Sequence, residues 1–108
     1  MLITTQDEFG DHEITETIGL VRGNVVRARH IGRDITAALR NIVGGEITEY
    51  TKLLAESREQ SLDRMTEHAR ELGADGIVAV RFTTSSIMNN AAELFVYGTA
   101  VKLRKKSG

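Results

Sequence analysis

Apolar and polar positions follow their most regular pattern between residues 46 and 72, where a set of mainly apolar residues recurs at steps close to three and four. The recurring positions are Ile47, Tyr50, Leu54, Ser61, Met65, Ala69 and Leu72, and charged residues occupy the opposite side. This spacing predicts an amphipathic helix, which would be about 40 Å long at about 1.5 Å per residue. Gly73 follows directly and is expected to end the helix in the left-handed conformation.

The middle of this helix carries small or polar residues where large apolar ones would be expected, namely Ser57, Gln60 and Ser61. Small side chains let another backbone approach closely, so we expect this middle part to lie against a second copy of the chain. The ends, around 53–54 and 65–72, are expected to pack on the subunit's own sheet. A helix of this length also exceeds what one small core can cover.

Two extended segments precede the helix in the sequence. Residues 2–5 predict a short strand, and residues 12–30 are rich in Ile, Val and Thr, with a change of apolar parity between Gly19 and Gly23. Glycine at such a change is typical of a bulge or a turn. We favour two strands that turn at Gly23 and Asn24 over one bent strand.

The C-terminal part predicts a β-hairpin, with strands over residues 77–86 and 91–103 and a loop at 88–90. Its second strand has apolar residues on both parities: Phe95, Tyr97, Val101 and Leu103 on one side, and Leu94, Val96 and Ala100 on the other. Both faces are therefore expected to be covered. Because the helices suffice for one face, copies of the chain are expected on the other. Residues 103–108 are expected to be a frayed basic tail.

A shorter helix is expected over residues 32–43. Its apolar stripe is Ile35, Ala38, Leu39 and Ile42, and the pair Gly44 and Gly45 ends it. The order of elements therefore predicts an α+β subunit: β-strands, a short helix, a long helix and then a β-hairpin. Its 108 residues suffice for one domain over residues 1–108 and not for two.

Charge and composition exclude several classes of function. The net charge is −1, which favours neither nucleic acid nor an anionic membrane. The arginines at 22, 27, 29 and 33 lack aromatic neighbours for base stacking, so a solvated or inter-subunit salt-bridged edge is favoured over a nucleic-acid site. The absence of Cys excludes disulfides and thiolate metal sites. Without a signal peptide or an apolar stretch of about 20 residues, a cytoplasmic protein is expected.

Metal-binding and catalytic residues form no clear constellation. Glu59, Asp63 and Glu67 lie four apart and would present three carboxylates on one helical face, with His68 beside them. A metal site needs converging ligands, and charged residues on helices are mostly exposed, so a solvated acidic face is favoured over a divalent metal site. The serines have no evident His partner, so nothing indicates an enzyme.

Several blocks follow one another in the order found in the YbjQ-like family. They are Arg40 to Glu46, Glu49 to Thr51, Leu53 with Leu54, Leu72 to Asp75, Val80 with Arg81, and Tyr97 to Val101. The chain resembles that family over nearly its whole length. The resemblance implies a small α+β subunit that assembles into a ring, a homopentamer, in which neighbours complete one another. The family is described as "putative heavy-metal-binding", and its biochemical role is otherwise open.

The junction before the long helix contains most of the remaining candidate residues. Its free backbone N–H groups could hold an anion, but Glu46 and Glu49 would repel one. Arg40, Asn41, Glu46 and Tyr50 favour instead a hydrogen-bonded corner that fixes the angle between the two helices. Together with Glu49 and Arg81, they are the candidates for a ligand site or a subunit junction.

We therefore expect a self-assembling protein that binds a divalent metal ion or a small ligand at the subunit junctions of a pentameric ring. In a ring, one ligand residue per subunit recurs around the axis, so such a site needs no motif within one chain. The alternative is a purely structural oligomer without a ligand, and a hydrolytic enzyme ranks third. Polar groups that face a pocket between chains would distinguish the binding protein from the structural one.

Overall fold

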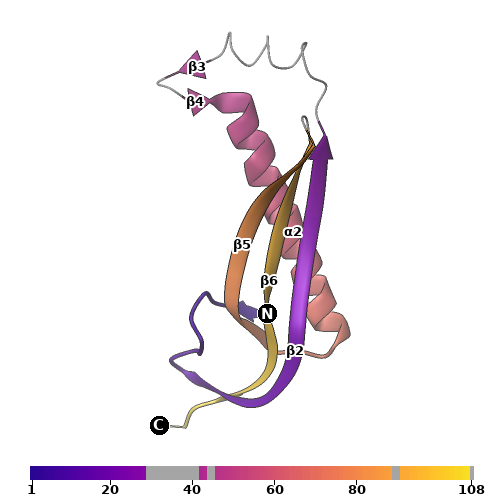
Figure 1. Cartoon of the computed structure of the whole chain (residues 1–108). Coiled ribbons are helices and arrows are strands. Elements are labelled where there is room, and N and C mark those ends of the chain that lie inside the picture. The colour runs from indigo at the N-terminus through magenta and orange to yellow at the C-terminus, as the bar shows by residue number, and fades with distance from the viewer. Residues whose placement is uncertain (29–41, 44–45, 89–90, 108) are drawn as a thin grey trace.

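The computed structural model describes residues 1–28, 42–43, 46–88 and 91–107. They form an α+β fold in which one long helix lies across one face of a four-stranded mixed sheet (Figure 1). The sheet has the order β1-β5-β6-β2 and consists of β1 (Leu2–Ile3), β5 (Gly76–Met88), β6 (Ala91–Lys105) and β2 (His12–Ala28). The helix is α2 (Thr48–Glu71), and β3 (Ile42–Val43) pairs with β4 (Glu46–Ile47) just before it.

The predicted hairpin is confirmed: β5 and β6 run antiparallel, from Gly76 opposite Val101 to Met88 opposite Ala91. Met88 thus belongs to the strand rather than to the loop. On the other side of β6, β2 pairs antiparallel along its whole length, and β1 adds a short parallel partner to β5. Within the described residues, the outer edge of β2 therefore has no strand partner.

Residues 12–28 form one continuous strand, so the expected turn at Gly23 and Asn24 is wrong. Gly23 pairs with Val96 and keeps the strand in register. The parity change arises at Gly19, where φ is 146° and the register shifts. Gly23 serves a different need: a Cβ there would lie 2.6 Å from the backbone nitrogen of Met65, so only glycine lets α2 approach β2 this closely.

The core lies between α2 and the sheet. It consists of Val21, Met65, Ala69, Ile77, Val80, Val96 and Ala100. Met65 and Ala69 pack on the sheet as the spacing predicts, whereas Leu72 is 45% exposed, so that end of the predicted stripe is wrong.

The middle of α2 lies against the subunit's own sheet, which contradicts the expected contact with a second copy. Ser57 and Ser61 are fully buried. The Ser61 hydroxyl lies 2.8 Å from the Ser57 carbonyl oxygen and 3.2 Å from that of Leu94, and either oxygen can accept its hydrogen. The small residues do permit a close approach, but the approaching backbone is that of β2 at Gly23.

The end of α2 confirms the prediction for Gly73, whose φ is 76°. The Gly73 N–H donates to the Arg70 carbonyl at 2.9 Å, and the Ala74 N–H donates to the Ala69 carbonyl at 3.0 Å. This pair of bonds satisfies carbonyls that the last turn would otherwise leave free. The chain thereby leaves the helix in the direction of β5.

The remaining expectations concern the tail and the short helix. Residues 103–105 continue β6, the Leu103 N–H donates to the Asp75 carboxylate at 2.9 Å, and the Lys106 N–H donates to the Asp11 carbonyl at 3.0 Å. The prediction of a tail that frays from residue 103 is therefore wrong. Of the predicted short helix, residues 32–41 lie outside the described part, and 42–43 belong to β3.

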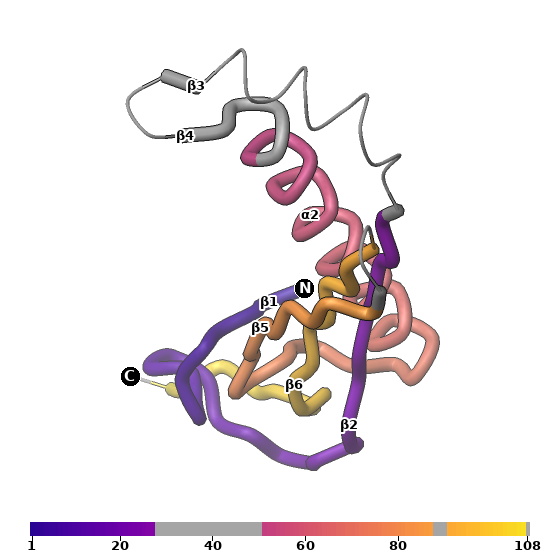
Figure 2. Tube along the Cα trace, turned by 45° about the horizontal axis from the view of Figure 1, so that its top comes forward, coloured from indigo at the N-terminus to yellow at the C-terminus, as the bar shows by residue number. Residues whose placement is uncertain are grey.

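The two faces of the sheet differ in cover. On the face under α2, Val21, Val25 and Val96 are buried, whereas Leu20 and Val26, which point the other way, are 65% and 54% exposed. The subunit is elongated, with extents of 57 × 27 × 16 Å and a radius of gyration of 17.7 Å. The N-terminal end of α2 diverges from the sheet (Figures 1 and 2). No helix in the described part is long and apolar enough to cross a membrane.

Candidate binding groove

The candidate corner before α2 is described only in part. Arg40 and Asn41 lie outside the described residues, as do the side chains of Glu46, Glu49 and Tyr50. The backbone places Glu46 opposite Val43 in the β3-β4 pair, directly before the first turn of α2. The hydrogen-bonded corner stays a prediction.

Arg81 lies apart from that corner and holds the N-terminal segment. Its Nη1 donates to the Thr5 carbonyl at 2.7 Å and to the Val80 carbonyl at 2.9 Å. Beside it, Ala79 has a φ of 55° and donates its N–H to the Gln6 carbonyl at 2.8 Å, at a register shift in β5. These contacts give Arg81 a structural role within the subunit.

The metal candidates do not converge within the described residues. Glu59, Asp63 and Glu67 are exposed on α2, and Glu67 pairs with Arg70 at 3.4 Å. His68 is half-buried, and its Nδ1 lies 3.4 Å from the backbone nitrogen of Arg22, whose N–H donates to it. No three His, Asp or Glu residues of the described part are arranged to hold a metal ion, and the chain has no Cys. One subunit's described residues therefore do not fit a heavy-metal site.

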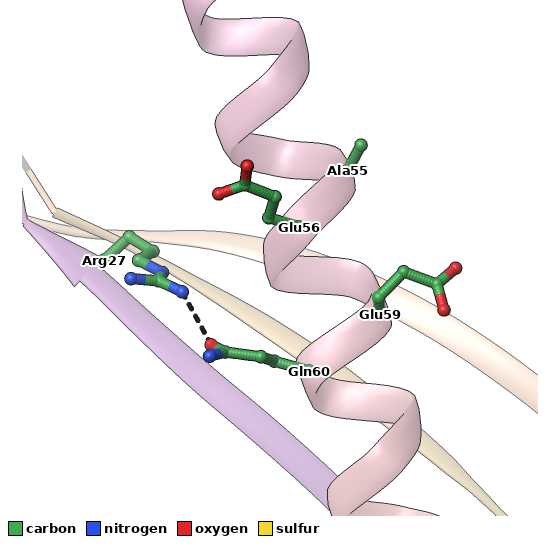
Figure 3. A pocket seen from close by; sticks show the side chains of 5 residues that line it. All are labelled: Arg27, Ala55, Glu56, Glu59 and Gln60. Carbon is green, nitrogen blue, oxygen red and sulfur yellow. Dashed lines mark hydrogen bonds between the residues drawn. The ribbon is translucent and has the colours of Figure 1, made fainter.

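The structure instead shows a groove between the end of β2 and the middle of α2, with a volume of about 480 Å³. It is lined by Arg27, Ala55, Glu56, Glu59 and Gln60 (Figure 3). This volume lies within the range of about 300–1,000 Å³ that is usual for small-molecule sites.

Arg27 is the fixed point of the groove. It is half-buried on the helix-facing side of β2, where its Nε donates to Ser57 Oγ at 3.1 Å and its Nη2 donates to Gln60 Oε1 at 2.6 Å. The buried Ser57 hydroxyl donates in turn to the Leu53 carbonyl at 2.8 Å, so its lone pairs remain for Arg27. Two neutral acceptors thus orient the guanidinium, and neither of them neutralises its charge.

No described carboxylate forms an ion pair with Arg27, although two carboxylates line the same groove. The ion pairs of the described part lie elsewhere, at His12 with Asp11, Arg70 with Glu67, and Arg104 with Glu13. Glu56 and Glu59 are both exposed. The groove therefore presents an oriented cation and two separate carboxylates to a ligand.

Sequence reasoning placed Arg27 in an arginine-rich edge and missed its role. One signal was available in the sequence: Arg27 has the same parity as Val21 and Val25, so it lies on the core side of the strand. A charged residue is rare on that side and usually has a specific partner there. A small residue had to stand opposite it, and Ser57 is that residue.

Comparison with known proteins assigns the chain to a family. The model of the YbjQ family, whose description is "Putative heavy-metal-binding", matches residues 1–104. The chain belongs to the YbjQ family. A UPF0145 protein of Methanococcus vannielii is 58% identical over 105 residues, which cover 97% of this chain and 100% of the relative. One from Archaeoglobus fulgidus is 55% identical over 104 residues, covering 96% of each chain.

A solved structure shares the fold of this YbjQ-family chain. It is the crystal structure of a protein with unknown function from Pediococcus pentosaceus, with a TM-score of 0.65 and 17% sequence identity. The match covers 96% of this chain and 98% of that one. At this identity the similarity supports the α+β fold and nothing about a ligand.

Proposed function

We propose that this YbjQ-family protein is a self-assembling binding protein, in which copies form a pentameric ring and hold a small ligand at their junctions. The observation that carries the proposal is the open sheet face, where Leu20 and Val26 are 65% and 54% exposed on a strand whose outer edge has no partner in the described part. Exposed apolar side chains and an unpaired edge are features that soluble proteins usually cover. Further copies of the chain are the cover we propose.

The ligand part of the proposal rests on the groove at Arg27. Its side chains come from β2 and α2, and β2 also carries the exposed apolar residues. The groove opens on the helix side of β2 and the exposed apolar residues lie on the other side, so a copy that pairs with the outer edge of β2 would border both. A metal ion would require ligands from more than one copy, because the described residues of one subunit do not supply them.

The test of assembly is the mass of the purified protein, measured by light scattering and by native mass spectrometry. The parent protein is expected to have several times the mass of one chain. Leu20→Asp is expected to lower that mass, because it places a charge on the open face. Leu72→Asp is the matched control, because Leu72 is also exposed, at 45%, but lies at the end of α2.

A monomeric parent protein would overturn the assembly proposal. A reduced mass in both variants would show that any added charge has this effect, and that the open face is not the interface. An assembled protein that retains no ligand and binds neither amino acids nor plain carboxylic acids would support the purely structural oligomer instead.

A further inference from the structure

The groove offers charges of both signs, and this determines which ligand it suits. We infer that it binds a small zwitterion, a molecule that carries one carboxylate and one ammonium group, as an amino acid does. The inference rests on the proposed function, in that it names the ligand class of the groove. It depends on Arg27 for the carboxylate and on Glu56 for the ammonium group.

The carboxylate position follows from the geometry of Arg27. A guanidinium has five N–H groups, and carboxylates bind it in pairs along one edge. Ser57 and Gln60 occupy the edge formed by Nε and Nη2. Among the described residues, no partner lies at the end formed by Nη1 and Nη2. This end can bind a planar carboxylate through two hydrogen bonds.

The ammonium position follows from the placement of the two carboxylates. Glu56 lies four residues before Gln60, so both side chains share one side of α2, and Gln60 contacts Arg27. Figure 3 shows the Glu56 carboxylate on the Arg27 side of the helix and the Glu59 carboxylate on the other side. Glu56 is thus the residue placed to meet an ammonium group while the carboxylate binds Arg27.

Ligands with a single charge fit this groove less well. A simple anion would be attracted by Arg27 and repelled by Glu56 and Glu59. A simple cation would be attracted by the two glutamates and repelled by Arg27. Because a zwitterion pairs each of its charges with the opposite one, it gains both attractions. Arg27 and Glu56 form no ion pair with each other, so neither has to be released before a ligand binds.

The test uses four probes and the full chain at low ionic strength. Alanine and 4-aminobutyrate are zwitterions of two lengths, and propionate and butyrate are their matches without the amine. Binding is measured by titration calorimetry and by NMR shifts of the protein. At least one amino acid is expected to bind about two- to fivefold more tightly than its amine-free match, which is the usual gain from one exposed charge pair.

Four variants test which side chain binds which charge of the ligand. Arg27→Gln is expected to lower the affinity for both the amino acid and the plain acid by about tenfold or more, because a charge-assisted hydrogen bond is lost. Glu56→Gln is expected to lower the affinity for the amino acid to that for the plain acid. Glu59→Gln is the matched control and is expected to preserve the preference for the amino acid. Arg27→Lys keeps the charge without the fork, so it is expected to bind between the parent and Arg27→Gln.

Three results would overturn the inference: no probe binds the parent protein, amino acids bind no better than plain acids, or Glu56→Gln leaves the preference unchanged. The last result applies even if Arg27→Gln fails to fold. Scattering mass is recorded on the same samples. If the protein assembles but does not prefer amino acids, only the inferred ligand class is wrong. If it is monomeric and still prefers amino acids, only the proposed assembly is wrong.

Discussion

The two faces of the sheet have similar apolar residues in very different surroundings. Val21 on the face under α2 is fully buried, whereas its neighbour Leu20 is 65% exposed. Val25 and Val26 repeat the contrast, at 4% and 54%. Neighbouring residues of a strand point to opposite faces, so a single helix accounts for the difference. Apolar residues on both parities thus indicate that both faces are meant to be covered, but not which chain covers each.

The largest expected effect is on the covered face. Met65→Ala should lower the free energy of unfolding by about 2–5 kcal/mol, because it empties a fully buried position between α2 and the sheet. Leu20→Ala is the control from the open face. Urea unfolding is measured at a concentration where scattering shows single subunits. Equal losses in the two variants would contradict the contrast between the faces.

The second prediction concerns the spacing between α2 and β2. Gly23→Ala should cost about 1–3 kcal/mol, because its Cβ would lie 2.6 Å from the Met65 backbone nitrogen and the helix would have to move. Gly10→Ala is the control, since no atom lies within 4 Å of its added Cβ. The midpoint of thermal unfolding compares the two. An unchanged midpoint for Gly23→Ala would mean that α2 lies farther from β2 than described.

A pair of neighbouring valines sharpens the comparison with the same chemical change on each face. Val25→Thr should cost about 1–3 kcal/mol, because it buries a hydroxyl in the core. Val26→Thr should change the stability of the single subunit by no more than about 0.5 kcal/mol. Urea titrations of both variants, under conditions that keep the subunits apart, measure the difference. If Val26→Thr were the costlier change, the faces would be assigned the wrong way round.

The smallest effect concerns the turn that directs the chain from α2 into the sheet. Gly73→Ala should destabilise by about 1 kcal/mol or slightly more, because φ is 76° there. An added Cβ meets only Lys102 Nζ, at 3.7 Å, so the cost is backbone strain rather than a clash. Gly73→Asn should lose less, because Asn tolerates this conformation better. Differential scanning calorimetry ranks the two, and a reversed order would argue against a strain mechanism.

The features predicted correctly from the sequence are those that local physics decides. The long helix follows from spacing, the hairpin from strand-forming runs, and the conformation of Gly73 from its place after Leu72. Each requires knowledge of only a few neighbouring residues. The coarse α+β class follows from their order, and the structure confirms it.

The errors arose where two distant segments determine the role of one residue. Gly23 resembles a turn in the sequence, but it is needed because Ser61 and Met65 of α2 lie against it. Ser57 and Ser61 were expected to face a second chain for the same physical reason, a close approach, and the sequence did not say which backbone approaches. Arg27 was likewise overlooked, because its two acceptors lie some thirty residues away.

The elongated outline of the subunit affects how its hydrodynamic behaviour is interpreted. A compact chain of this length would have a radius of gyration of about 13 Å, whereas this one has 17.7 Å. A 57 Å body only 16 Å thick experiences more friction than a sphere of equal mass. A lone subunit would therefore leave a gel-filtration column ahead of globular standards of its own weight. Sedimentation velocity resolves this ambiguity, because it separates the frictional ratio from the mass.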